Sequence, residues 1–173
     1  MTTTTSAPSA ASRLPPPVTT ILGEAKLDAL RRGYAAAPAA LASSAEQAFG
    51  AMYSPGSVVF NAFVDHFFTH GDDAPPVSTL SPRDRERSII AIMAAMNVSH
   101  ALAIHMYWGL GEGVTVAEIA EILLLVGGYA GTACYTNGLS LLSKTLVSLG
   151  GLLPGEPPYA PVDPLVALRA LTG

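Results

Sequence analysis

Residues 81–97 read Ser-Pro-Arg-Asp-Arg-Glu-Arg-Ser-Ile-Ile-Ala-Ile-Met-Ala-Ala-Met-Asn, and they carry the strongest helix signal in the chain. Ser81 suits the N-cap of a helix, Pro82 suits its first turn, and Asp84 stands where a capping box has its acidic residue. The apolar residues from Ile89 to Met96 follow at helical spacing. The stretch therefore predicts a helix with a charged start and an apolar continuation.

Helix signals continue on both sides of this stretch. Upstream, the pattern predicts helices over residues 24–32, 38–53 and 57–70, the first of which ends at Gly33. Downstream, it predicts helices over 99–109, over 115–127 with a second capping box from Thr115 to Glu118, and over 129–149 after a break near Gly128. No pair of segments reads as a β-hairpin. The sequence therefore predicts an all-α bundle of about six to seven helices.

The chain is predicted to consist of one domain with a tail at each end. Its 173 residues suit a single domain. Residues 1–20 are rich in Thr, Ser, Ala and Pro and are predicted to be a disordered N-terminal tail. Residues 21–153 are predicted to form the domain. Residues 154–173 contain five prolines and are predicted to be a Pro-rich C-terminal tail with a short turn over 165–171.

Composition narrows the class of protein. Only 13% of the residues are charged, about half the usual share, which predicts that further copies of the chain cover part of the surface. The formal net charge of −4 disfavours nucleic-acid binding, which needs a basic stripe. The most apolar stretch, residues 122–135, has 14 residues, whereas a membrane-spanning helix needs about 20, so no membrane span is predicted.

The cysteine content excludes several kinds of site and indicates the compartment. Cys134 is the single cysteine, which excludes an intrachain disulfide, a CxxC redox pair and a multi-cysteine metal site. It favours a reducing compartment, and we predict a cytoplasmic location. A redox role for Cys134 alone would need an exposed thiol beside a basic group, and the neighbouring residues supply none.

Glu86, His100 and His105 are the candidate catalytic residues. Glu86 lies in the charged start of the 81–97 helix, and both histidines lie among small and apolar residues. Burial lowers the pKa of a histidine and a nearby carboxylate raises it, so such a pair is equipped for proton transfer near neutral pH. The histidines are five residues apart, or about 140° around a helix, which leaves open which of them meets a substrate.

Other polar residues have a structural as well as a functional interpretation. Glu86 can instead pair with a neighbouring arginine, and His105 can be a hydrogen-bonded core histidine. His66, Tyr107 and Tyr129 are candidate substrate-binding residues, although aromatic residues are more often found in a core or an interface. His66 and His70, four residues apart, can begin a metal site, but no third ligand is evident. We therefore predict no metal and no other cofactor.

Several pieces of sequence between Leu80 and Leu142 resemble the carboxymuconolactone decarboxylase superfamily, which includes alkyl hydroperoxidase D. They are residues 80–86, an apolar helix, His105 with a Gly-rich turn, residues 114–121 and residues 129–131. The peroxidase branch shows Cys-Ser-His-Cys-Leu-x-x-His, where residues 98–105 read Val-Ser-His-Ala-Leu-Ala-Ile-His. Both histidines are kept, both cysteines are replaced, and Glu86 falls at the spacing of the family's relay glutamate.

The resemblance implies a function without thiol chemistry. A thiol peroxidase needs one thiolate to attack the peroxide and a second thiol to resolve the product, which argues against that activity here. What remains resembles the cofactor-free branch, a group of lyase-type enzymes that act on small lactone acids by proton transfer. The resemblance implies an all-α homotrimer or homohexamer. His105 would be the acid/base, Glu86 would orient it, and His100 would hold a substrate carboxylate.

A second hypothesis belongs to a different class. The chain can be a non-catalytic ligand-binding or assembly protein that kept the scaffold after losing its cysteines. An enzyme predicts a histidine that is open to substrate and within hydrogen-bond reach of a carboxylate. A non-catalytic relative predicts histidines that are either packed shut or fully solvated.

Overall fold

The computed structural model describes residues 20–36 and 80–172, and this part of the chain is all-helical, without a strand. The predicted all-α fold class is confirmed. The helices predicted over 38–53 and 57–70, together with His66 and His70, lie outside the described residues. Six helices are described: α2 (Glu24–Ala36), α5 (Pro82–Ala95), α6 (Ser99–Gly111), α7 (Val116–Ala130), α8 (Thr132–Gly151) and α9 (Pro164–Thr172).

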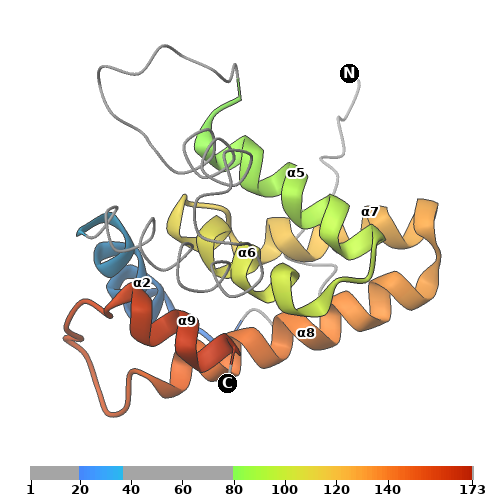
Figure 1. Cartoon of the computed structure of the whole chain (residues 1–173). Coiled ribbons are helices and arrows are strands. Elements are labelled where there is room, and N and C mark those ends of the chain that lie inside the picture. Colours follow the sequence, from blue (N-terminus) through green and yellow to red (C-terminus); the bar gives the residue numbers. More distant parts are fainter. Residues whose placement is uncertain (1–19, 37–79, 173) are drawn as a thin grey trace, which may run out of the picture.

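Helix α6 is the centre of the bundle. Every residue from Leu102 to Leu110 is buried, so this helix is covered on all sides. Its neighbours are α5, α8, α2 and α9, while α7 packs chiefly against α5 and α8 (Figure 1). A helix that is apolar all round is stable only inside such an enclosure. A polar side chain within residues 102–110 of α6, such as that of His105, is therefore surrounded mainly by protein and not by water.

Two predicted helix starts are confirmed by their capping bonds. The Ser81 hydroxyl accepts a hydrogen bond from the backbone N–H of Asp84, and Pro82 occupies the first turn of α5. Thr115 and Glu118 form a reciprocal capping box at the start of α7. By contrast, α6 begins after Val98 without a side-chain cap, and Ser99 lies in its first turn.

Two glycines expected to end helices lie inside them. Helix α2 continues through Gly33 to Ala36 because this glycine provides space: a Cβ there would overlap the backbone of Val162. Helix α7 likewise continues through Gly128 and ends at Gly131, whose φ of 105° is a conformation that glycine adopts readily. The break between α7 and α8 therefore lies three residues later than predicted.

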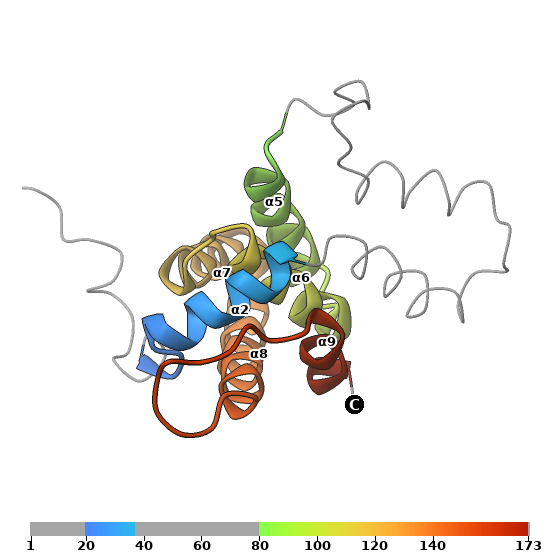
Figure 2. The same ribbon diagram turned by 90° about the vertical axis from the view of Figure 1, so that its left-hand side faces the viewer.

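The C-terminal segment differs from the predicted tail. Residues 164–172 form α9, and Val162, Ala167 and Leu168 join the hydrophobic core of the chain itself. Ahead of α9 the chain crosses α2, where the backbone N–H of Val162 donates to the carbonyl of Ala29 at 3.3 Å (Figure 2). The prolines that suggested a loose tail lie in this crossing and at the start of α9. Among the described residues, no helix has both the length and the apolar character needed to cross a membrane.

Candidate functional site

His105 and Glu86 form a buried pair between α6 and α5. The imidazole Nδ1 lies 2.9 Å from Glu86 Oε2, and each side chain is 11% exposed. Glu86 stands in the second turn of α5 and His105 near the middle of α6, two helices that pack closely against each other. The predicted histidine–carboxylate contact is thus present in the fold.

The geometry of the pair fixes the chemistry of the imidazole. A carboxylate oxygen accepts but does not donate, so the Nδ1 that faces it carries a proton. The other ring nitrogen, Nε2, is then the position at which a proton can be gained or released. The ring of Trp108 meets the imidazole edge to face, with centroids 4.9 Å apart and an interplanar angle of 87°, which restricts rotation of His105. The arrangement suits a general acid or base whose orientation is fixed.

Two of the arginines near Glu86, Arg83 and Arg87, contact other carboxylates. Arg83 bridges to Glu118 on α7, and Arg87 contacts Asp84 at 3.4 Å. Hydrogen bonds from Thr115 and Arg83 lower the pKa of Glu118 below its ordinary value. The hydroxyl of Ser81, followed by Arg87, similarly lowers the pKa of Asp84. These contacts tie the start of α5 to α7 and fix the turn from which Glu86 projects.

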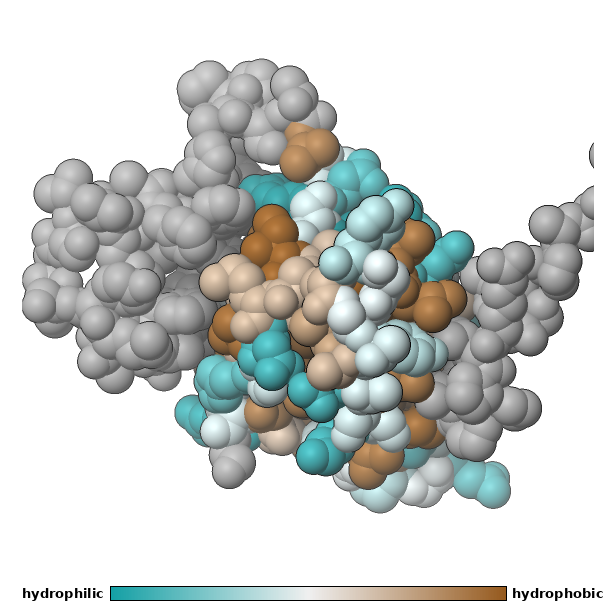
Figure 3. Space-filling model, turned by 90° about the vertical axis from the view of Figure 1, so that its right-hand side faces the viewer, coloured by the Kyte–Doolittle hydropathy of each residue, from teal (hydrophilic) through white to brown (hydrophobic). Residues whose placement is uncertain are grey.

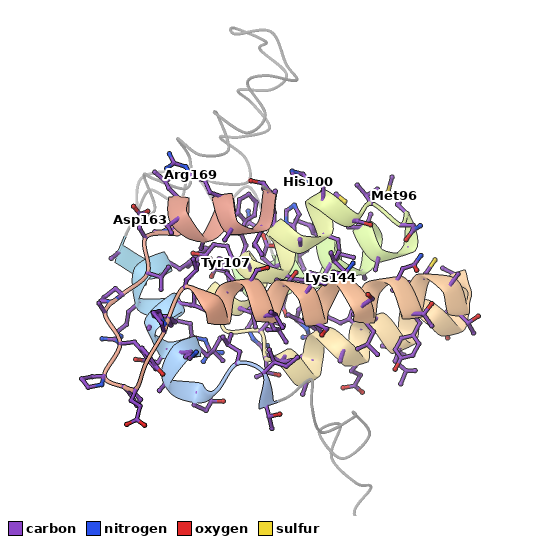
Figure 4. All side chains as sticks on the ribbon, turned by 90° about the horizontal axis from the view of Figure 1, so that it is seen from below. Met96, His100, Tyr107, Lys144, Asp163 and Arg169 are labelled. Carbon is purple, nitrogen blue, oxygen red and sulfur yellow. The ribbon has the colours of Figure 1, made fainter. Side chains whose placement is uncertain are left out.

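His100 does not join the pair. It lies in the first turn of α6 and is exposed, on the outside of the bundle (Figure 4). Its separation of five residues from His105 turns it to another side of the helix. That His100 holds a substrate carboxylate therefore stays a prediction, and it now concerns a residue on the surface.

The two tyrosines predicted to bind substrate have opposite environments. Tyr107 is completely buried, and its hydroxyl has no hydrogen-bond partner among the described residues. Burial, with a contribution from the charge of Asp163, raises the pKa of Tyr107 above its ordinary value. Tyr129 is 93% exposed near the end of α7. The structure therefore brings together two of the predicted site residues, Glu86 and His105, and sets these tyrosines apart from each other.

Cys134 lies in the first turn of α8. Its sulfur faces the carbonyl oxygens of Ala130 at 3.6 Å and Ala95 at 3.8 Å. Carbonyl oxygens offer no positive charge to stabilise a thiolate, so this environment does not supply what a reactive cysteine needs.

Tyr34 and Glu112, which contact each other at the end of α6, were not singled out from the sequence. Tyr34 of α2 donates a hydrogen bond from its hydroxyl to Glu112 Oε1 at 2.7 Å, at the end of α6. They are 78 positions apart in sequence, and neither belongs to the motif that contains the histidines. The spacing of Glu112 from His105, seven residues or two turns of one helix face, was the available clue.

The described residues thus form an all-helical bundle in which the packed helices α5 and α6 share a buried histidine–carboxylate pair. Residues 60–144 match the model of the Carboxymuconolactone decarboxylase family, a segment that includes α5, α6 and α7. This match supports the predicted superfamily, and the single cysteine of the chain is consistent with a branch that lacks the cysteine pair. No curated protein and no solved structure matched the chain.

Proposed function

We propose that the chain is a cofactor-free enzyme that transfers protons on a small lactone or carbonyl acid, with His105 as the acid/base. The observation that carries the proposal is the 2.9 Å contact between His105 Nδ1 and Glu86 Oε2, inside the family segment. Decarboxylation, lactone hydrolysis, isomerisation and cyclisation all need a proton delivered to or removed from a substrate atom. A lyase reaction is the form that the family name favours.

A decarboxylation illustrates what each residue does. The C–C bond to the carboxylate breaks, CO₂ leaves, and the electron pair remains on the substrate as an enolate. His105 then gives the proton on Nε2 to the enolate carbon and regains one from water. Glu86 stabilises the positive charge of the imidazolium before that transfer and keeps Nδ1 protonated after it. His100 holds a substrate carboxylate and the exposed Tyr129 contributes an aromatic contact, whereas the completely buried Tyr107 offers no surface to a substrate.

Self-association belongs to the same proposal. Helix α7 exposes Leu125 (60%) and Tyr129 on one face, and Met96, which follows α5, is 64% exposed. Figure 3 shows hydrophobic residues, in brown, on one face of the molecule. Exposed apolar groups of this size are unusual on a monomer and mark contacts with partners. We propose that further copies of the chain cover them in a homotrimer or homohexamer. Leu125→Glu is expected to lower the mass measured by light scattering, whereas Val166→Glu, on α9, is the control.

The activity test uses a screen of lactone and β-keto acids with the full-length protein. His105→Ala is expected to lower turnover by about 100-fold or more, the usual contribution of a general acid or base. His100→Ala is expected to raise KM and to leave kcat nearly unchanged. Ser88→Ala serves as the control, because this exposed serine lies two residues from Glu86 and its hydroxyl bonds only to the Asp84 carbonyl in the structure.

A non-catalytic role is the second candidate, and the small exposure of His105 favours it. A side chain that is 11% exposed offers little surface to a substrate. This candidate predicts that substrates bind, or that copies assemble, without any turnover. Equal turnover by the wild type and His105→Ala would remove His105 from the mechanism. Loss of turnover in His105→Ala, with its helical circular dichroism intact, would support the enzyme. We place either function in the cytoplasm, because the single cysteine favours a reducing compartment.

A further inference from the structure

Tyr34 connects α2 to the last turn of α6 through both its ring and its hydroxyl. The hydroxyl donates to Glu112 Oε1 at 2.7 Å. The ring lies so close to Gly111 that a Cβ at this position would come within 2.5 Å of it. It also meets the ring of Tyr107 edge to face, with centroids 6.1 Å apart. These three contacts hold the Tyr34 side chain in one position against the last turn of α6.

The attachment point lies on the same face of α6 as His105. His105, Trp108 and Glu112 are spaced by three and four residues, the spacing at which side chains of a helix stand one above the next. Trp108 is in ring contact with His105, as described above. Trp108 therefore occupies the position between His105 and Glu112 on this face.

The position of Glu112 is electrostatically unfavourable for a negative charge. It caps the C-terminal end of α6, where the helix dipole is negative. A hydrogen-bond donor is needed to hold its charge there, and Tyr34 is that donor. A second contact from α2, Arg31 Nε to the Leu110 carbonyl at 3.1 Å, satisfies the backbone of the same turn without touching the carboxylate.

The hydroxyl of Tyr34 is held in its protonated, donating form. Burial is the largest cause that raises the pKa of Tyr34 above its ordinary value, followed by the hydrogen bond to Glu112 and the charge of that residue. The charge of Glu86 contributes in the same direction, which indicates that the hydroxyl lies within the electrostatic reach of the buried pair.

We propose that Tyr34 is a positioning residue for the His105–Glu86 pair: by anchoring Glu112 it fixes the last turn of α6 and, through Trp108, the orientation of the imidazole. This inference deepens the proposed function and rests on it for its biological meaning. The geometric claim itself concerns the pair and requires no substrate.

The first test uses Tyr34→Phe, which keeps the ring and removes the hydroxyl. Trp108 is the single tryptophan, so its fluorescence reports on the neighbourhood of His105 alone. We expect acrylamide to quench Trp108 more strongly in the variant. We also expect the Nδ1 proton of His105, followed by NMR, to exchange with water about tenfold faster, the amount that one lost hydrogen bond represents.

Arg32→Ala is the matched control on the same helix. Its guanidinium bonds to the Tyr159 carbonyl at 2.9 Å and to Asp28, on the side of α2 that faces the C-terminal crossing. It removes a tertiary contact of α2 but leaves Tyr34 in place, so both signals should stay at their wild-type values. If Tyr34→Phe lowers the melting temperature but changes neither signal, Tyr34 has only a structural role and the proposal is wrong.

Glu112→Gln tests the route through α6. The amide keeps the side-chain shape and weakens the bond from Tyr34, so it should reproduce the Tyr34→Phe signals. The double variant should add nothing further, because both changes break one contact. Independent, additive effects would overturn the proposed route. Once a substrate is known, Tyr34→Phe should lower kcat more than it changes KM. A chain without any turnover but with the expected signals would refute the proposed enzyme and leave the positioning role standing.

Discussion

His105→Ala is expected to destabilise the chain far more than Glu86→Gln, although both remove the same pair. The alanine leaves a carboxylate that is 11% exposed without the partner that the structure gives it. Removing one member of a buried charged pair costs about 3–5 kcal/mol, and the residual exposure places this case near the lower figure. The glutamine still accepts a hydrogen bond from Nδ1, so its cost is about 1 kcal/mol.

These free energies convert into separate melting temperatures. A chain of this length shifts by about 2–4 °C for each kcal/mol, so His105→Ala should melt about 6–12 °C lower and Glu86→Gln about 2–4 °C lower. Thermal unfolding followed by far-UV circular dichroism measures both, with Ser88→Ala as the unchanged control. A His105→Ala variant that melts with the wild type would refute the reasoning, because it would mean that Glu86 is hydrated in solution.

Replacing both residues separates stability from function. In the variant with His105→Phe and Glu86→Leu, no charge remains in the contact between α5 and α6. Apolar replacements of a buried charged pair are often neutral, or stabilising by about 1–4 kcal/mol. We expect this double variant to melt at or above the wild-type temperature while losing proton transfer completely. A large loss of stability would instead show that the pair is a structural requirement of the fold.

Three further predictions concern pH and packing. The pKa values of Tyr34 and Tyr107 are raised above the ordinary 10.0. Their contribution to the free energy of unfolding is therefore constant below pH 10.0, and above that pH it falls by about 1.4 kcal/mol per tyrosine for each pH unit. In urea unfolding, Tyr107→Phe should lose less stability than the wild type as the pH rises above 10.0. Glu118 has a pKa lowered from 4.5, so its contribution is present above that pH and is lost as pH falls below it; acid unfolding of Glu118→Gln should be less steep. Gly138→Ala would place a Cβ 2.7 Å from Leu123 Cδ2 and should lower the free energy of unfolding by about 1–3 kcal/mol. In Gly128→Ala the new Cβ would meet nothing within 4 Å, so this variant should raise the free energy of unfolding by about 0.5–1 kcal/mol. Thermal unfolding measures both changes.

Local signals explain which parts of the fold the sequence predicted well. The capping residues at Ser81 and Thr115 act within one turn, so their meaning does not depend on distant contacts. A glycine, by contrast, does not show from its neighbours in sequence whether a helix ends there. Gly33 and Gly128 resemble helix ends in sequence, but only the crossing at Val162 explains why a helix continues through the first of them. Helix α9 was missed for a related reason, because its stability comes from packing on the core.

In the candidate site, too, some residues could be predicted from the sequence and others could not. His105 and Glu86 were found because a histidine and a carboxylate in apolar surroundings are rare enough to be noticed in sequence, and α5 and α6 then bring them to 2.9 Å. Tyr34 was not found, because a tyrosine on an amphipathic helix has no unusual feature until its partner is known. Its contact with Glu112 joins residues 78 positions apart, which no spacing rule covers.

The position of the pair bears on why a chain of this kind retains it. A charged contact inside an apolar helix interface is a poor way to stabilise a fold, since leucine and phenylalanine there would serve as well or better. The closed surroundings of α6 make the cost larger, because water cannot reach Glu86 freely when His105 turns away. A costly contact that is also held in a fixed orientation, by Trp108 on one side and Glu86 on the other, supports the proposed proton transfer at the remaining ring nitrogen.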